Sequence, residues 1–166
     1  MYMAIDTDGL HKRTMRGMSI TAGTMVAPMV HGWSKELETR AAKYDVEGAK
    51  KLLAEAGYPN GFNLKLECPN DRYVNDEAIC TAIVPMLERI GIRVMPNFQT
   101  KSLWQDKIGL KGGNRTSFYM LGWTPTTFDA FNTLQNVMTL NPKSHGIWNA
   151  GRYSNPKVDS LIDDIR

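Results

Sequence analysis

Two hydrophobic periods alternate through the middle of the chain. Apolar residues form a helical stripe over 45–56 and a second one over 76–90. Residues 62–68 and 92–98 instead alternate strictly between apolar and polar positions, which is typical of strands with one face on a core. A continuous apolar run at 118–121 indicates a strand buried on both faces. Together with a short helix before that run, the order is strand, helix, strand, helix, strand, which predicts parallel strands joined by crossovers in an α/β fold.

Cap residues mark where these helices begin and end. Asp45 and Asp76 each open a helix, while Gly57 and Gly91 each end one. Pro85 lies inside the second helix, where it is expected to remove a hydrogen bond and introduce a kink. Residues 18–42 and 139–156 show no sustained period and are expected to be irregular. Further helices are predicted at 1–17, with Asp6 as an internal cap, at 101–110, around Phe131–Met138, and from Asn155 onward.

Parallel sheets place a ligand crevice beyond the carboxyl ends of their strands. Three segments follow the predicted strands at that edge, namely 70–75, 99–104 and 123–129. The last precedes a helix, whose first N–H groups can bind a carboxylate or phosphate. The sequence therefore predicts one ligand site where the three segments meet.

The candidate binding residues come from the first and third segments. Arg72 can hold a carboxylate through two parallel hydrogen bonds, with Tyr73 covering the ligand. Trp123 can stack on a sugar or a side chain. The alternative for Arg72 is a solvated surface position and for Trp123 core packing. Thr127 or Asp129 could instead serve only as a helix cap. The full set is Asn70, Arg72, Tyr73, Trp123, Thr124, Thr126, Thr127 and Asp129.

Composition and charge exclude several classes of protein. The 166 residues are 42% hydrophobic and 22% charged, which fits one globular domain and excludes a disordered chain or a coiled coil. The 20 basic and 17 acidic residues give a formal charge of only +3, spread along the chain, so no nucleic-acid partner is expected. No apolar run is long enough to predict insertion into a membrane.

The residues that usually carry catalysis are scattered. No nucleophile motif accompanies the three histidines, and the adjacent pair Asp163 and Asp164 faces in different directions on a helix. We therefore predict no catalytic residue, metal or cofactor. The histidines are His11, His31 and His145.

Cys68 and Cys80 are the two cysteines of the chain. Cys68 ends a predicted strand and Cys80 lies in the first turns of the next helix, so the intervening loop brings them back toward each other. They form either one disulfide or two buried thiols, and a Cα separation above about 7 Å would exclude the disulfide.

Seven short motifs occur in order along the chain. They are AID at 4–6, YD at 44–45, AKKLLAEAGYPNGF at 49–62, PNDRYVND at 69–76, IGI at 90–92, LGW at 121–123 and GRYSNP at 151–156. Together they resemble the family 5 extracellular solute-binding proteins, which include the dipeptide, oligopeptide, nickel and glutathione binders of ATP-driven (ABC) importers. The resemblance covers nearly the whole chain.

The resemblance implies a clamp of two α/β lobes, of the type II periplasmic binding protein kind, with a mainly parallel or mixed sheet flanked by helices in three layers. Residues 1–166 would form a single α/β lobe, most of the second one. The first lobe, the signal peptide and the return segment to the hinge would lie outside the sequence, and the abrupt apolar start and helical end of the chain agree with this.

The resemblance also implies a function. It implies capture of a peptide or another small polar solute, delivery to a membrane permease and no catalysis, in the periplasm or tethered outside a single-membrane organism. In peptide-binding relatives an aspartate three residues after the tryptophan pairs with the peptide's amino terminus. That position is Thr126 here, with Asp129 the nearest carboxylate, so the solute stays open. The other hypotheses are a stand-alone α/β enzyme domain using Asp129 or Cys68, and a ligand-sensing domain.

Overall fold

The computed structural model describes residues 1–39, 43–109, 116–139 and 146–165. They belong to two compact units. Unit 1 comprises Met1–Thr21, Ala41–Trp104 and Phe118–Met120, and unit 2 comprises Ala22–Arg40, Gln105–Ser117 and Leu121–Arg166. That the whole chain forms a single lobe stays a prediction.

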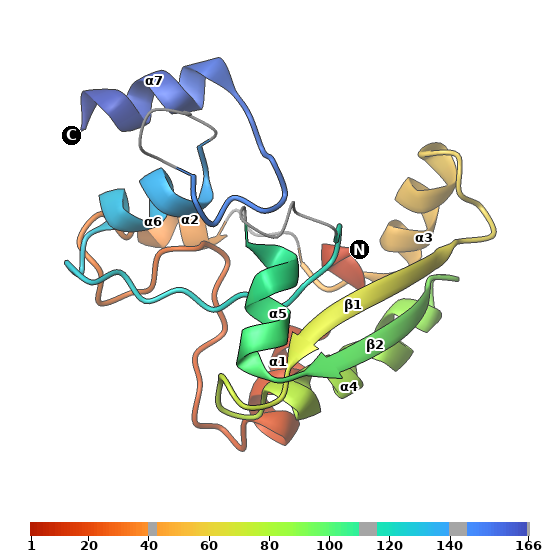
Figure 1. Ribbon diagram of the computed structural model, residues 1–166. Coiled ribbons are helices and arrows are strands. Elements are labelled where there is room, and N and C mark those ends of the chain that lie inside the picture. The colour runs from red at the N-terminus through yellow and green to blue at the C-terminus, as the bar shows by residue number, and fades with distance from the viewer. Residues whose placement is uncertain (40–42, 110–115, 140–145, 166) are drawn as a thin grey trace. The chain divides into compact units, whose positions relative to one another are not determined.

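Unit 1 is built on two parallel strands. In β1 (Asn63–Pro69) and β2 (Arg93–Gln99), Asn63 lies opposite Arg93 and the register continues to Pro69 and Gln99. The helix α4 (Asp76–Glu88) connects them and packs against both strands, running unbroken through Pro85 (Figure 1). This strand–helix–strand unit confirms the predicted α/β class.

A buried apolar cluster holds unit 1 together. The inward side chains of both strands meet α4 and α3 (Val46–Glu55) there, because alternate strand positions face one side of the sheet. Asp45 caps α3 by accepting a hydrogen bond from Gly48 N at 2.8 Å, as predicted. The buried members are Ala4, Ala49, Leu66, Cys68, Cys80, Leu87, Ile90, Ile92 and Val94.

The predicted strand at 118–121 is wrong. Within this segment, Tyr119 forms an isolated parallel bridge to Glu67. Two hydrogen bonds make the bridge: Glu67 N donates to Phe118 O at 3.1 Å, and Met120 N donates to Glu67 O at 3.0 Å. Phe118 and Met120 are half-buried against the apolar cluster. The apolar run is thus explained by packing on one side and a single bridge. β1 is the central segment, because it pairs with β2 on one side and with Tyr119 on the other.

Unit 1 also contains short helices at the start of the chain and directly after β2. One of these helices precedes Asp6, two follow it, and the fourth comes directly after β2. They are η1 (Tyr2–Ala4), α1 (Thr7–Gly9), η2 (Leu10–Thr14) and α5 (Lys101–Ile108), which continues past the end of unit 1 at Trp104.

In the described part of the chain, three helices lie wholly within unit 2, namely α2 (Lys35–Thr39), α6 (Ala130–Val137) and α7 (Pro156–Asp164). α6 and α7 contact each other. The last two were predicted, and the structure shows that Asp129 caps α6 and Asn155 caps α7. α2 lies in a stretch without hydrophobic period. Glu38 connects it to the preceding loop by accepting from Trp33 Nε1 at 3.0 Å and Thr24 Oγ1 at 3.1 Å. Within the described ranges, no helix combines the length and apolar character needed to cross a bilayer.

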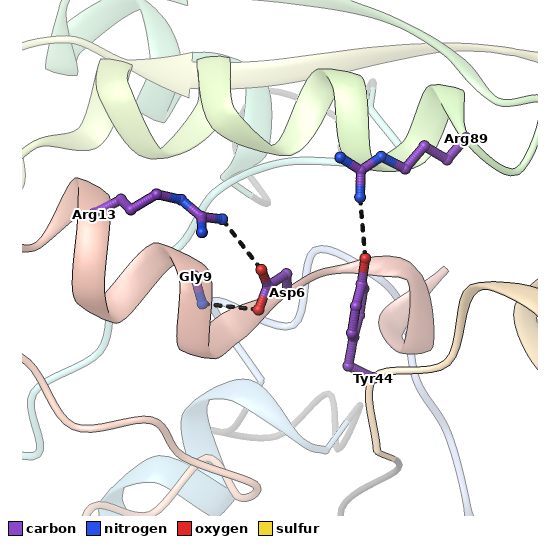
Figure 2. Close-up of polar contacts among 5 residues, drawn as sticks. All are labelled: Asp6, Gly9, Arg13, Tyr44 and Arg89. Carbon is purple, nitrogen blue, oxygen red and sulfur yellow. Dashed lines mark hydrogen bonds and ion pairs between the residues drawn. The ribbon is translucent and has the colours of Figure 1, made fainter.

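Asp6 organises the start of unit 1. Its carboxylate accepts hydrogen bonds from Gly9 N at 2.8 Å and Arg13 Nη2 at 3.1 Å, and nearby Arg89 donates to the Tyr44 hydroxyl at 3.1 Å (Figure 2). The Gly9 N–H holds the pKa of Asp6 below its ordinary value. Partial burial opposes this shift, and Arg13 adds to it. The carboxylate is therefore better stabilised in the folded chain than in the unfolded one.

We expect the stability contributed by Asp6 to disappear in acid. Because the folded pKa is the lower one, the contribution is complete above the pKa of Asp6 in the unfolded chain and is lost as the pH falls through its folded pKa. Asp6→Ala should lower the free energy of unfolding by about 1 kcal/mol at neutral pH. Thermal denaturation at a series of pH values should show this difference shrinking toward acid. Asp8→Ala, at an exposed neighbour, is the control, and a difference independent of pH would contradict the prediction.

Candidate functional site

The segments that follow β1 and β2 lie together in unit 1. Asn70 N donates a hydrogen bond to Gln99 O at 2.9 Å, and Lys101 N donates to the Asp71 carboxylate. These bonds join the two loops at the carboxyl ends of the parallel strands, where the sequence predicted the crevice. The prediction that 70–75 and 99–104 meet is therefore confirmed.

Arg72 and Tyr73 form one stacked group with Trp104. The Arg72 guanidinium carbon lies 5.0 Å from the centroid of the Tyr73 ring, and that ring stands perpendicular to Trp104 at a centroid distance of 5.8 Å. Arg72 is exposed, whereas Trp104 is 1% exposed and its indole N–H has no acceptor in the described part of the chain. The group thus carries the exposed Arg72 guanidinium on an aromatic support, while the Trp104 N–H is enclosed. Sequence reasoning did not single out Trp104, although it lies in the predicted segment 99–104.

Asp76 fixes the backbone beneath this group. Its side chain accepts hydrogen bonds from Arg72 N at 2.9 Å, Tyr73 N at 3.0 Å and Glu77 N at 2.9 Å. Burial raises the pKa of Asp76, but the N–H donors from Tyr73, Arg72 and Glu77 outweigh it, and the pKa is held below its ordinary value. Asp76 is therefore a buried, ionised anchor for the loop.

Cys68 and Cys80 are joined in a disulfide, with their Cα atoms 6.6 Å apart. Of the two possibilities that the sequence left open, the structure shows the bridge. It ties the end of β1 to the first turns of α4. Both cysteines are buried, and the loop carrying Arg72 and Tyr73 lies between them.

The third predicted segment lies in unit 2 and is organised by Asn132. Trp123 is half-buried, and its Nε1 donates to Asn132 Oδ1 at 3.1 Å. Asn132 Nδ2 donates to Thr126 Oγ1 at 3.3 Å, while Trp148 lies tilted beside Trp123 at a centroid distance of 6.4 Å. Thr124, Thr126 and Thr127 are exposed. Neither Asn132 nor Trp148 carried a sequence signal beyond its residue type.

Asp129 has two structural partners. One oxygen caps α6 by accepting from Phe131 N at 2.8 Å, and the other lies 2.8 Å from His31 Nδ1. The Phe131 N–H and then His31 hold the pKa of Asp129 below its ordinary value. Backbone hydrogen bonds from His31 N to Phe128 O and from Ala130 N to His31 O complete the junction. Asp129 therefore does act as a helix cap, which was the alternative to ligand binding. No sequence pattern indicated that His31 pairs with Asp129.

The candidate residues therefore form two clusters, one in each unit. That they make up a single ligand site stays a prediction. Within the described residues, no three His, Cys, Asp or Glu side chains gather as a metal ion would require.

Residues 1–144 match the family model of the bacterial extracellular solute-binding proteins, family 5 (middle). The chain belongs to this family. It is 28% identical over 170 residues to the heme-binding protein A of Haemophilus influenzae, covering 97% of this chain and 29% of that protein. It is 25% identical over 159 residues to a glutathione-binding protein of Pectobacterium atrosepticum, covering 95% and 30%.

Solved structures show the same fold. The periplasmic binding protein DppA of Helicobacter pylori, in complex with the peptide STSA, superimposes with a TM-score of 0.81 at 21% identity, covering 98% of this chain and 30% of that one. The chain thus spans about 30% of the length of these relatives. Their names describe binding proteins, which agrees with the expected class.

Proposed function

We propose that this chain is the solute-binding part of one lobe of a larger protein that captures a small solute for an ATP-driven importer. The observation that carries the proposal is the family match over residues 1–144. The stacked Arg72–Tyr73–Trp104 group supports it, because it presents the exposed Arg72 guanidinium at the strand ends where α/β folds bind ligands. The partner is a membrane permease, the site of action is the periplasm or the outer surface of a single-membrane cell, and no reaction is catalysed.

The chemistry of the two clusters favours a solute rich in oxygen acceptors. Arg72 is an exposed cation whose guanidinium carries several N–H donors. Both oxygens of Asp129 already accept hydrogen bonds, so it is a weak candidate for a solute amine. Arg72 suits a carboxylate or carbonyl oxygen of a solute, and Trp123 suits an apolar or sugar face.

The remaining candidates would complete the contacts. Asn70, Thr124, Thr126 and Thr127 are exposed, and their amide and hydroxyl groups can donate or accept hydrogen bonds. Because a clamp closes on its solute from both sides, we expect the 166-residue chain alone to bind weakly or not at all. Calorimetry should compare it with a protein that carries both lobes, using heme, glutathione and the peptide STSA as probes. Equal affinity of the two proteins would contradict this expectation.

We expect Trp123→Ala to weaken solute binding while the fold survives. Losing a buried aromatic contact should cost about 1–3 kcal/mol, or roughly 5- to 150-fold in the dissociation constant. Calorimetry with the two-lobed protein and the probe that it binds measures the effect. Tyr58→Ala, at an exposed aromatic residue that follows α3, is the control.

Two outcomes would count against these proposals. Unchanged affinity in Trp123→Ala would remove Trp123 from the site. A probe recovered chemically altered after incubation would favour the enzyme hypothesis over solute capture.

A further inference from the structure

The loop that carries Arg72 and Tyr73 is fastened at its base by a covalent bond. The disulfide joins Cys68 and Cys80, which are 12 positions apart in the sequence, and the two cysteines are 0% and 1% exposed. Buried sulfur atoms are shielded from exchange with thiols in solution, so this bridge acts as a fixed constraint on the loop.

The same loop is fastened a second time at the stacked pair itself. Asp76 accepts from two successive N–H groups, those of Arg72 and Tyr73, and this fixes the backbone from which both side chains project. Asp71 adds a third attachment by accepting from Lys101 N, which ties the loop to the start of α5. On this backbone the Arg72 guanidinium lies over the Tyr73 ring.

Ordering a binding loop in advance changes what solute binding requires. A flexible loop must lose conformational freedom when the solute arrives, whereas a loop already fixed does not, and the affinity is higher by that difference. The contact of the exposed Arg72 guanidinium with the Tyr73 ring restricts its orientations, which suits bidentate contact with a planar group.

We propose that the Cys68–Cys80 bridge and Asp76 are positioning groups, which hold the Arg72–Tyr73 pair in its binding arrangement before the solute arrives. The inference rests on the proposed function. Its consequence is that high-affinity capture needs the oxidised chain. The bridge forms when the two thiols give up two electrons and two protons to a disulfide-bearing oxidant, which becomes a dithiol. In a reducing compartment the pair is loosened, so solute capture begins after export.

Solution NMR without any solute tests the positioning role directly. The 166-residue chain, oxidised, is compared with Cys68→Ala/Cys80→Ala and with Asp76→Asn. We expect hydrogen exchange at the Arg72 and Tyr73 amides to become at least about tenfold faster in both variants. The ring-current shift of the Arg72 side chain over Tyr73 should collapse toward its value in an unstructured peptide.

A stability-matched control separates positioning from general weakening. Leu87→Ala removes a fully buried side chain of α4 and lowers the stability of the same core without touching the loop. It should leave the ring-current shift intact. The proposal is overturned if Leu87→Ala erases that shift equally, or if the shift persists in both test variants.

A binding arm keeps this inference distinguishable from the proposed function. In a two-lobed protein that binds heme, glutathione or STSA, Cys68→Ala/Cys80→Ala should lower the affinity at least about fivefold. Unchanged affinity would overturn the positioning role and leave solute capture standing. If the wild-type protein binds no solute, the proposed function fails, and the NMR result still decides how the pair is held.

Discussion

Replacing Gly61 with alanine is expected to destabilise the protein by about 3 kcal/mol, one of the largest effects of any single substitution in unit 1. Gly61 has φ +69°, a left-handed conformation that costs other residues about 1–2 kcal/mol. A Cβ atom at Gly61 would also collide with the carbonyl group of Gly91. The two glycines precede β1 and β2, so the collision would push apart the turns that start the parallel pair.

Two other glycines separate the strain from the collision. Gly57 has φ +89°, and a Cβ atom added there would meet nothing within 4 Å, so Gly57→Ala should show the conformational cost alone, about 1 kcal/mol. Gly91 has φ +85°, and the atoms nearest to an added Cβ would lie at 3.4 Å, an ordinary contact. Chemical denaturation should therefore rank Gly61→Ala well below Gly57→Ala and Gly91→Ala in stability. Equal losses at all three positions would show that the turns can move apart.

The sequence predicted best the elements whose local signals agree with one another. Asp45 and Gly57 bound α3 as expected, because a capping carboxylate and a left-handed glycine are required by local geometry alone. The alternation in 62–68 predicted β1 because one of its faces is buried. Family resemblance then supplied the function class, which no single residue shows.

Sequence reasoning failed where distant residues decide the outcome. The run at 118–121 has the composition of a buried strand, but within the described part of the chain it forms an isolated bridge at Tyr119 and no strand. The pairing of His31 with Asp129 joins residues 98 positions apart, and no local pattern encodes it. Trp104 is similar, because its role depends on the position of Tyr73 beside it.

Removing the disulfide should destabilise unit 1 by about 3 kcal/mol, the value expected for a closed loop of roughly this length. The reason is that the bridge restricts the unfolded chain between Cys68 and Cys80, which therefore loses less entropy on folding. Both cysteines belong to the buried cluster, so Cys68→Ala/Cys80→Ala also removes two packed sulfur atoms, which adds to the loss. Chemical denaturation of the wild type and the double variant measures the difference.

Reductant provides the internal control for this prediction. The unfolding midpoint of the wild type should fall when a reductant is present throughout denaturation, because the unfolded chain is then free of its cross-link. The double variant has no cysteine left and should not respond. Since the bridge encloses Arg72 and Tyr73, the same constraint acts on the fold and on the proposed binding loop. A wild type indifferent to reductant, and as stable as the double variant, would show that the cysteines contribute packing alone.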